Sequence, residues 1–299
     1  MKGLRRFKGI VFALISSGTF GLIPLFSIPL VEDLGVNEAN VLFYRFFFSA
    51  LMMGGICLLH RSNMRIAARH LLPIFGLGAL YALTALFLVY AYNYIASGIA
   101  TTIHFLYPLC VSLLMVLFFG EKLSKVLFIS AILSLIGVGL MCWTDEGSIS
   151  GWGVFLASLT IVAYGTYIVG LNQLEVGKLP ADVLTFYVVL AGALIFFVYA
   201  QFDGGGVEPI PSLRAGMHLM ALAFFATVVS DFSLIMAVKY AGSTVTAILG
   251  SMEPVVAVTV GVLVFAESFS YYALLGFLLI LISVVLVILS QRPKAEQGS

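Results

Sequence analysis

Four ionisable side chains lie inside long apolar runs of this 299-residue chain, namely Arg45, His104, Asp231 and Glu253. A charged side chain at the centre of a bilayer costs about 2.5–3.5 kcal/mol on insertion scales, so such residues persist where they face a cavity or a partner. A carboxyl group in that setting can also take up and release a proton. The types of residue therefore predict that Glu253 and Asp231 bind a solute or carry protons.

Glu253 lies about ten residues into its apolar run, which places it near the bilayer midplane at ~1.5 Å per residue. Pro254 follows it directly, and proline removes one backbone donor and frees the carbonyl four residues earlier, at Gly250. Thr246 shares this face at helical spacing. The carboxylate, the freed carbonyl and the hydroxyl suit a proton, a cation or an amine. The alternative is that Glu253 only braces the kink.

Asp231 and His104 are the next candidates. Thr227 precedes Asp231 by about one turn, and Thr101 shares a face with His104. Histidine can change its charge near neutral pH, so His104 can bind a solute or act in a proton relay. For both residues the alternative is a structural hydrogen bond to a neighbouring helix. No second His or Cys stands at metal-ligand spacing, so we expect no metal site.

Arg45 lies in the segment FYRFF, closer to the end of its run. A long cationic side chain at that depth can extend to the surface, so we interpret Arg45 as an anchor or as the partner of Glu38. Tyr81, Tyr107 and Tyr164 offer both apolar area and a hydroxyl, and we expect them to form walls for an amphipathic solute.

The composition identifies the setting for these side chains. Of the residues, 62% are apolar and 10% are charged, the mean hydropathy is +1.13 and the formal net charge is +1. Soluble domains carry roughly 25% charge. The composition therefore excludes a soluble enzyme, a disordered chain and a nucleic-acid binder, and it indicates a membrane protein with lipid as its surroundings.

Apolar runs of the length of a membrane-spanning helix, about 20 residues, recur along the whole chain. They predict ten transmembrane helices, and their length excludes the short alternating strands of a membrane barrel. The expected spans are residues 9–31, 39–59, 71–93, 98–119, 125–143, 152–173, 182–201, 217–239, 243–265 and 270–290.

The orientation follows from Lys and Arg, which concentrate on the cytoplasmic side of membrane proteins. With the N-terminus in the cytoplasm, thirteen of the 15 basic residues fall on that side. Both termini are therefore expected in the cytoplasm, with the protein in the inner (plasma) membrane of a bacterium. These residues are Lys2, Arg5, Arg6, Lys8, Arg61, Arg65, Arg69, Lys122, Lys125, Lys178, Lys239, Arg292 and Lys294.

The chain repeats itself at an offset of 146 residues. Tyr94, Ser97 and Pro108 recur as Tyr240, Ser243 and Pro254, and the register from 91–124 to 237–270 holds without a gap. Each half contains five predicted spans, and an odd number makes the halves face opposite ways. We therefore expect an all-α membrane protein of two inverted five-helix repeats, residues 1–147 and 148–299, around a central cavity. Kinks are expected at Pro24, Pro29, Pro108 and Pro254.

The repeated segments also resemble a known family. Each has a small-residue start, a proline in mid-span and a glutamate about thirteen residues later, as in Pro108 to Glu121 and Pro254 to Glu267. This pattern is similar to EamA-type members of the drug/metabolite transporter superfamily. The resemblance implies exporters or facilitators of amino acids, other metabolites, dyes or drugs. It also implies a cavity lined by spans 1, 3, 4, 6, 8 and 9, with spans 5 and 10 at the periphery.

We therefore expect a secondary transporter, an exporter or facilitator working by alternating access, for a neutral, zwitterionic or cationic metabolite. A single intramembrane Arg does not suit a phosphate ester, which favours several basic groups. No nucleotide-binding loop or cofactor motif is present, and no enzymatic activity is expected. The alternatives are an intramembrane enzyme that uses His104 with an acidic partner, and a passive channel. The sequence leaves open a monomer or a homodimer. The expected solute-binding residues are Tyr81, Thr101, His104, Tyr107, Tyr164, Thr227, Asp231, Thr246 and Glu253, with Glu253 and Asp231 as proton-coupling groups.

Overall fold

The computed structural model describes residues 2–95, 97–120, 125–141, 150–203, 205–264 and 271–290, and within these ranges it is helical, with no strand. Glu121 and Glu267, which the sequence pattern singled out, lie outside the described residues. The helices before residue 142 are α1 (Lys2–Phe20), α2 (Ile23–Glu32), α3 (Glu38–Leu59), α4 (Ala68–Tyr92), α5 (Ser97–His104), α6 (Tyr107–Phe119) and α7 (Lys125–Met141).

The helices after residue 149 include two short segments of different pitch, a 3₁₀ helix at Glu175–Lys178 and a π-helix at Phe224–Val229. The α-helices of this region are α8 (Gly151–Gln173), α9 (Ala181–Asp203), α10 (Leu213–Ala223), α11 (Ser230–Ala241), α12 (Ser243–Leu249), α13 (Met252–Val264) and α14 (Tyr271–Ser290).

Seven helical stretches in the described residues are long and apolar enough to cross a membrane. Three further apolar helices are shorter, at Tyr107–Phe119, Phe128–Gly137 and Leu274–Ser283, and they fall within the remaining predicted spans. The prediction of an all-helical membrane protein is thus confirmed at the level of helices and their apolar character. The seven spans are Arg5–Glu32, Glu38–Leu59, Ala68–Tyr92, Gly151–Gln173, Ala181–Phe202, Leu213–Ala241 and Ser243–Val264.

Short turns at 21–22 and 250–251 interrupt two of these spans, and a third turn at 105–106 separates α5 from α6. A proline stands in the first turn of the helix that follows each interruption, at Pro24, Pro108 and Pro254. Proline is tolerated there because the first turn of a helix has no intrahelical partner for its N–H groups. Pro29 differs, since α2 continues through it to Glu32.

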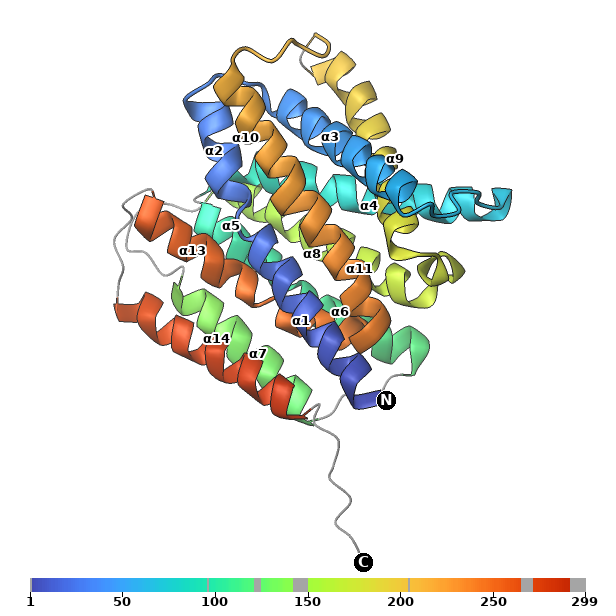
Figure 1. Cartoon of the computed structure of the whole chain (residues 1–299). Helices are drawn as coiled ribbons and strands as arrows, with labels where there is room; N and C mark the ends of the chain where they lie inside the picture. The colour runs from blue at the N-terminus through green and yellow to red at the C-terminus, as the bar shows by residue number, and fades with distance from the viewer. Residues whose placement is uncertain are drawn as a thin grey trace, which may run out of the picture.

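The helices pack in pairs that combine early and late parts of the chain (Figure 1). The most extensively packed pairs are α7 with α14, α3 with α9, α1 with α11, and α4 with α8. The pair of α7 and α14 lies side by side at one edge of the bundle.

Glycines allow close approaches between helices, and two of these approaches are related by the repeat spacing of the chain. A methyl group at Gly21 would meet the Glu253 carbonyl and Val256, while one at Gly165 would meet Cys110 and the carbonyl of Tyr107. Gly21 and Gly165 are 144 residues apart, and their neighbours are 146 residues apart. The two parts of the chain therefore repeat this packing contact.

Two tyrosines make matching hydrogen bonds to the connections between helices. The hydroxyl of Tyr44 in α3 donates to the carbonyl of Glu208 at 2.6 Å, and the hydroxyl of Tyr187 in α9 donates to the carbonyl of Met64 at 2.8 Å. The α3–α9 pair is antiparallel, because Phe43 near the start of α3 contacts Phe197 near the end of α9. The two bonds therefore lie at opposite ends of this pair.

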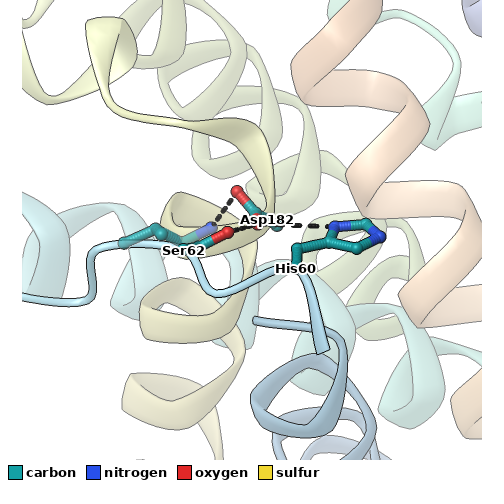
Figure 2. A network of polar contacts seen from close by, with 4 residues as sticks. His60, Ser62 and Asp182 are labelled. Atoms are coloured by element: carbon teal, nitrogen blue, oxygen red, sulfur yellow. Dashed lines mark hydrogen bonds and ion pairs between the residues drawn. The ribbon is translucent and has the colours of Figure 1, made fainter. Parts of the chain in front are cut away.

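A polar network accompanies the Tyr187 bond (Figure 2). The Asp182 carboxylate at the start of α9 accepts a hydrogen bond from the hydroxyl of Ser62 and lies 3.8 Å from Nδ1 of His60. It also accepts a bond from the backbone N–H of Val183 at 2.9 Å. Arg61, which lies between His60 and Ser62, has a left-handed φ of 53°. Asp182 therefore contacts the residues on both sides of the sharp turn that ends α3.

Candidate functional site

Aromatic rings from several helices meet at the centre of the bundle. Tyr164 of α8 lies 4.8 Å from Tyr107, 5.2 Å from His104 and 5.9 Å from Phe20 between ring centroids. The stack continues from Tyr164 through Tyr167 at 6.0 Å to Tyr81, which is 5.2 Å farther on. We call these six residues the aromatic cluster: Phe20, Tyr81, His104, Tyr107, Tyr164 and Tyr167. All six are buried.

His104 has one ring nitrogen with a hydrogen-bond partner and one without a partner among the described residues. Its Nδ1 lies 2.8 Å from the hydroxyl of Thr160, and that hydroxyl donates its single hydrogen to the carbonyl of Ala157 at 2.5 Å. Nδ1 of His104 must therefore be the donor to Thr160. In the neutral ring Nε2 is then an acceptor, and it has no hydrogen-bond partner among the described residues.

Asp231 in α11 is buried beside the aromatic cluster. Its Oδ1 accepts a hydrogen bond from the hydroxyl of Tyr167 at 2.6 Å, while its Oδ2 has no partner in the described part of the chain. Thr227, one turn earlier, uses its hydroxyl to accept a bond from Nε of Arg45 at 2.7 Å. The carboxylate therefore keeps one acceptor available, and Thr227 faces Arg45.

Arg45 does not extend to the surface, so its interpretation as an anchor was wrong. It is only 2% exposed, and its guanidinium lies over the rings of Phe20 and Phe46 at 5.9 and 5.7 Å. Nη2 donates to the carbonyl of Ala226 at 3.2 Å. Glu38, the expected partner, instead accepts a bond from Asn93 at 3.2 Å. Hydrogen-bond acceptors in the bundle interior thus hold this cation inside.

Glu253 stands in the first turn of α13 and is 4% exposed. It lines a small cavity whose wall includes Gly21, Pro24 and Thr101. The expected free carbonyl at Gly250 is not free, because it accepts the backbone N–H of Glu253 at 2.9 Å. This hydrogen bond takes the place of the one that Pro254, which has no N–H, cannot donate to Gly250.

The expected partner Thr246 turns to its own helix, where its hydroxyl donates to the carbonyl of Gly242 at 2.7 Å. The hydroxyl of Tyr107 approaches the same segment at Gly250, where a side chain would overlap it. At the repeat offset of 146 residues, Tyr107 is the counterpart of Glu253, and His104 is the counterpart of Gly250. The two interrupted helices thus present different polar groups at equivalent positions.

The centre of the bundle contains several buried polar atoms without a partner among the described residues. They are Tyr81 Oη, His104 Nε2, Asp231 Oδ2 and Ser251 Oγ. Buried polar atoms are usually hydrogen-bonded, so an unpaired set requires an explanation such as water or a ligand. The structure thus brings Tyr81, Tyr107, Tyr164, His104 and Asp231 together, with Glu253 and Thr101 around the adjoining cavity.

Sequence reasoning did not single out Tyr167, Thr160 or Ser251 for this site. Tyr167 follows Tyr164 by three residues, and this helical spacing was a usable signal. Thr160 and Ser251 gave no comparable signal, because single hydroxyl residues are common in membrane helices.

A larger cavity, of about 630 Å³, lies between α4, α6 and α8 and is open to the outside. Its wall is almost entirely apolar and includes Leu77, Leu114, Phe118 and Val169. Such a surface suits a hydrocarbon chain and offers a polar solute little to bind. The described residues include no group of three or more His, Cys, Asp or Glu side chains that could hold a metal ion.

Comparison with known proteins gives a family. The model of the EamA-like transporter family matches residues 7–143 and again residues 151–289. No curated protein sequence matches the chain. Among solved proteins, 29 chains match. One crystal structure of a protein is similar with a TM-score of 0.76 at 17% sequence identity, over 97% of this chain and 97% of its own, which supports the fold.

Proposed function

The chain belongs to the EamA-like transporter family of the drug/metabolite transporter superfamily, and we propose that it is a proton-coupled carrier that exports a small amine-bearing metabolite. The solute is a zwitterion or an organic cation with an apolar body. It binds within the aromatic cluster and is carried by alternating access.

One observation carries this proposal: two of the four unpaired polar atoms of the buried centre are acceptors only, and the other two are hydroxyls, which can also accept. Asp231 Oδ2 and His104 Nε2 can each accept a hydrogen bond and cannot donate one in the ionised carboxylate and the neutral ring. An ammonium group is a donor only, and aromatic faces attract organic cations. The rings of Tyr81, Tyr164 and Tyr167 supply such faces.

The balance of charge also supports an amine. Arg45 is permanently positive, and Asp231 and Glu253 can each be negative. The three residues are buried, so a cationic group that enters the centre replaces a proton on one carboxyl group without leaving a surplus of charge. A phosphate ester would need more basic groups than the single Arg45 supplies.

The arrangement in the membrane forms part of the proposal. Ten spans form two inverted repeats, residues 1–147 and 148–299, with the shorter helices α7 and α14 as the fifth span of each. The paired glycine contacts support this assignment, because each half then makes the same contacts with the other. The distribution of Lys and Arg supports cytoplasmic termini and a bacterial inner membrane.

A transport assay on purified protein in liposomes tests the function. A panel of amines, amino acids and neutral solutes is assayed with an imposed pH gradient present and absent. We expect saturable uptake and countertransport of amine-bearing solutes, accelerated by the gradient. Uptake that does not saturate would indicate a channel and contradict the carrier, and release of a chemical product would indicate an enzyme.

Two variants locate the proton coupling. We expect Glu253→Gln to remove the dependence on the pH gradient, and Asp231→Asn to weaken solute binding at least tenfold. Glu175→Gln is the matched control, because Glu175 is an exposed carboxylate in the 3₁₀ helix outside the bundle centre. Gradient-dependent transport in Glu253→Gln at the rate of the control would contradict the assigned role.

A further inference from the structure

The span Leu213–Ala241 contains the π-helix Phe224–Val229 in its middle. A π-helical turn accommodates one residue more than an α-helical turn, and such turns are frequent at functional sites. Successive residues of an α-helix are separated by about 100°, as 3.6 residues per turn require. If this segment became α-helical with all its residues kept, α11 would be rotated by about 100° relative to α10.

Asp231 is the second residue of α11, directly after the π-helix. A rotation of about 100° would remove its carboxylate from Tyr167, whose hydroxyl now lies 2.6 Å from Oδ1. The π-helix therefore sets the direction in which Asp231 points. At the repeat offset, the counterpart of Asp231 in α4 is Ala85, and α4 is α-helical throughout.

Two side chains of α3 bind the polar groups of this segment. The hydroxyl of Ser49 donates to the carbonyl of Arg45 in its own helix at 2.7 Å and also lies 3.1 Å from the carbonyl of Ala223, just before the π-helix, so the two carbonyls share its one hydrogen. Arg45, one turn earlier on α3, donates to the carbonyl of Ala226 at 3.2 Å and to the hydroxyl of Thr227 at 2.7 Å. All of these groups are buried. The bonds thus bracket the first half of the π-helix from one neighbouring helix.

A π-helix interrupts the regular i→i+4 bonding of an α-helix and needs other partners for the groups it displaces. Arg45 supplies a partner for the Ala226 carbonyl, and Ser49 supplies a shared one for the Ala223 carbonyl. The planar guanidinium also reaches the hydroxyl of Thr227, and a lysine ammonium does not match this two-acceptor geometry. From this geometry we propose that Arg45 and Ser49 are positioning residues: they hold the π-helix in place and so direct Asp231 into the solute site. The inference rests on the proposed function only in taking Asp231 as a solute-binding group.

The first test measures the direction of Asp231 without any transport. 3-Fluorotyrosine is incorporated at position 167 and observed by ¹⁹F NMR in the full-length protein. Asp231→Asn gives the reference shift for a weakened Tyr167–Asp231 bond. We expect the double variant Arg45→Lys/Ser49→Ala, which keeps the charge, to move the resonance toward that reference. A resonance that stays at its wild-type position would overturn the proposal, whatever solute the protein carries.

The second test is a rescue by deletion. Phe225 of the π-helix is 42% exposed and packs on the ring of Phe26. Removing it deletes the extra residue and leaves an α-helix with Asp231 in its original direction. In the Arg45→Lys/Ser49→Ala background this deletion should restore the ¹⁹F resonance.

Transport gives a matching readout in the same variants. We expect the double variant to raise KM at least tenfold with kcat changed less than threefold, and the deletion to return KM to within threefold of wild type. If the deletion of Phe225 changes neither the KM nor the resonance of the double variant, Arg45 and Ser49 act in another way and the proposal is overturned. If no amine is transported while the ¹⁹F results hold, the proposed function fails and the positioning role stands.

Discussion

Tyr44 and Tyr187 make the same hydrogen bond at opposite ends of the α3–α9 pair. Each donates its hydroxyl to a backbone carbonyl in a connection between helices, at Glu208 and Met64 respectively. The tyrosines are 143 residues apart and the acceptors are 144 residues apart. The bonds differ in their surroundings, since the Met64 end adds the carboxylate of Asp182 with Ser62 and His60, as Figure 2 shows.

This pair of hydrogen bonds predicts that losing one of them makes only the nearby end of α3 more accessible to reagents. Cys57 is fully buried near the end of α3 that Tyr187 and Asp182 hold. We expect Tyr187→Phe to increase the labelling rate of Cys57 by a polar thiol reagent about fivefold, because losing one net hydrogen bond of about 1 kcal/mol loosens that end. The measurement uses protein with Cys110 and Cys142 replaced by serine. Tyr44→Phe is the control, and equal acceleration by both variants would contradict the prediction.

Because Thr160 fixes the tautomer of His104, substitutions of Thr160 should change how His104 binds a solute. Thr160→Val removes the acceptor that holds the hydrogen on Nδ1, and the ring can then place it on Nε2. We expect the KM for an amine to rise about five- to tenfold in this variant. Thr160→Ser keeps the acceptor and should behave as wild type in the same assay. An unchanged KM in Thr160→Val would rule out Nε2 as an acceptor for the solute.

The close contact at Gly21 predicts a loss of stability. A methyl group at this position would collide with the carbonyl of Glu253, and backbone atoms cannot yield as a flexible side chain does. We expect Gly21→Ala to destabilise the protein by about 1–3 kcal/mol. Thermal unfolding in detergent measures the change. Gly18→Ala, three residues earlier in α1, is the control, because a methyl group there meets no atom within 4 Å.

Gly250 and Tyr107 predict a coupled pair. Gly250→Ala should destabilise the protein, since the new methyl group overlaps the Tyr107 hydroxyl. Tyr107→Phe removes the oxygen and should recover part of the loss, with a coupling energy of about 0.5–3 kcal/mol. A double-mutant cycle by thermal unfolding measures this coupling. Additive effects of the two substitutions would show that the ring moves away from α12.

Much of the fold could be predicted from the sequence because apolar periodicity and length constrain membrane helices strongly. The expected spans agree with the seven long apolar helices to within a few residues. The interruptions at 105–106 and 250–251 lie beside Pro108 and Pro254, where a proline signal was visible. The π-helix was not predicted, because the segment FFATVV has no feature that separates it from ordinary α-helix.

The site was predicted less completely. Asp231, His104 and the three tyrosines could be named because polar groups are rare in apolar runs. Arg45 was misplaced, since depth alone permits either a route to the surface or an internal bond, and only packing shows that Ala226 and Thr227 accept its hydrogen bonds. The hydrogen bond of the Thr246 hydroxyl to the Gly242 carbonyl could not be predicted either, because a threonine in a helix can bond to its own backbone instead of to a solute.

Arg45 is a permanent cation buried in the same bundle as the carboxyl groups of Asp231 and Glu253, and this affects how transport responds to the membrane potential. With one proton on Asp231 or Glu253, the charge of Arg45 and the remaining carboxylate cancel, and a monovalent organic cation in place of that proton leaves the same total. A unit charge moved alone through 100 mV gains or loses about 2.3 kcal/mol. An exchange of one proton for one such cation moves no net charge. If the carrier exchanges one proton for one organic cation, as proposed, the membrane potential does no work on the exchange, and the difference in proton concentration alone sets how far the solute can be accumulated.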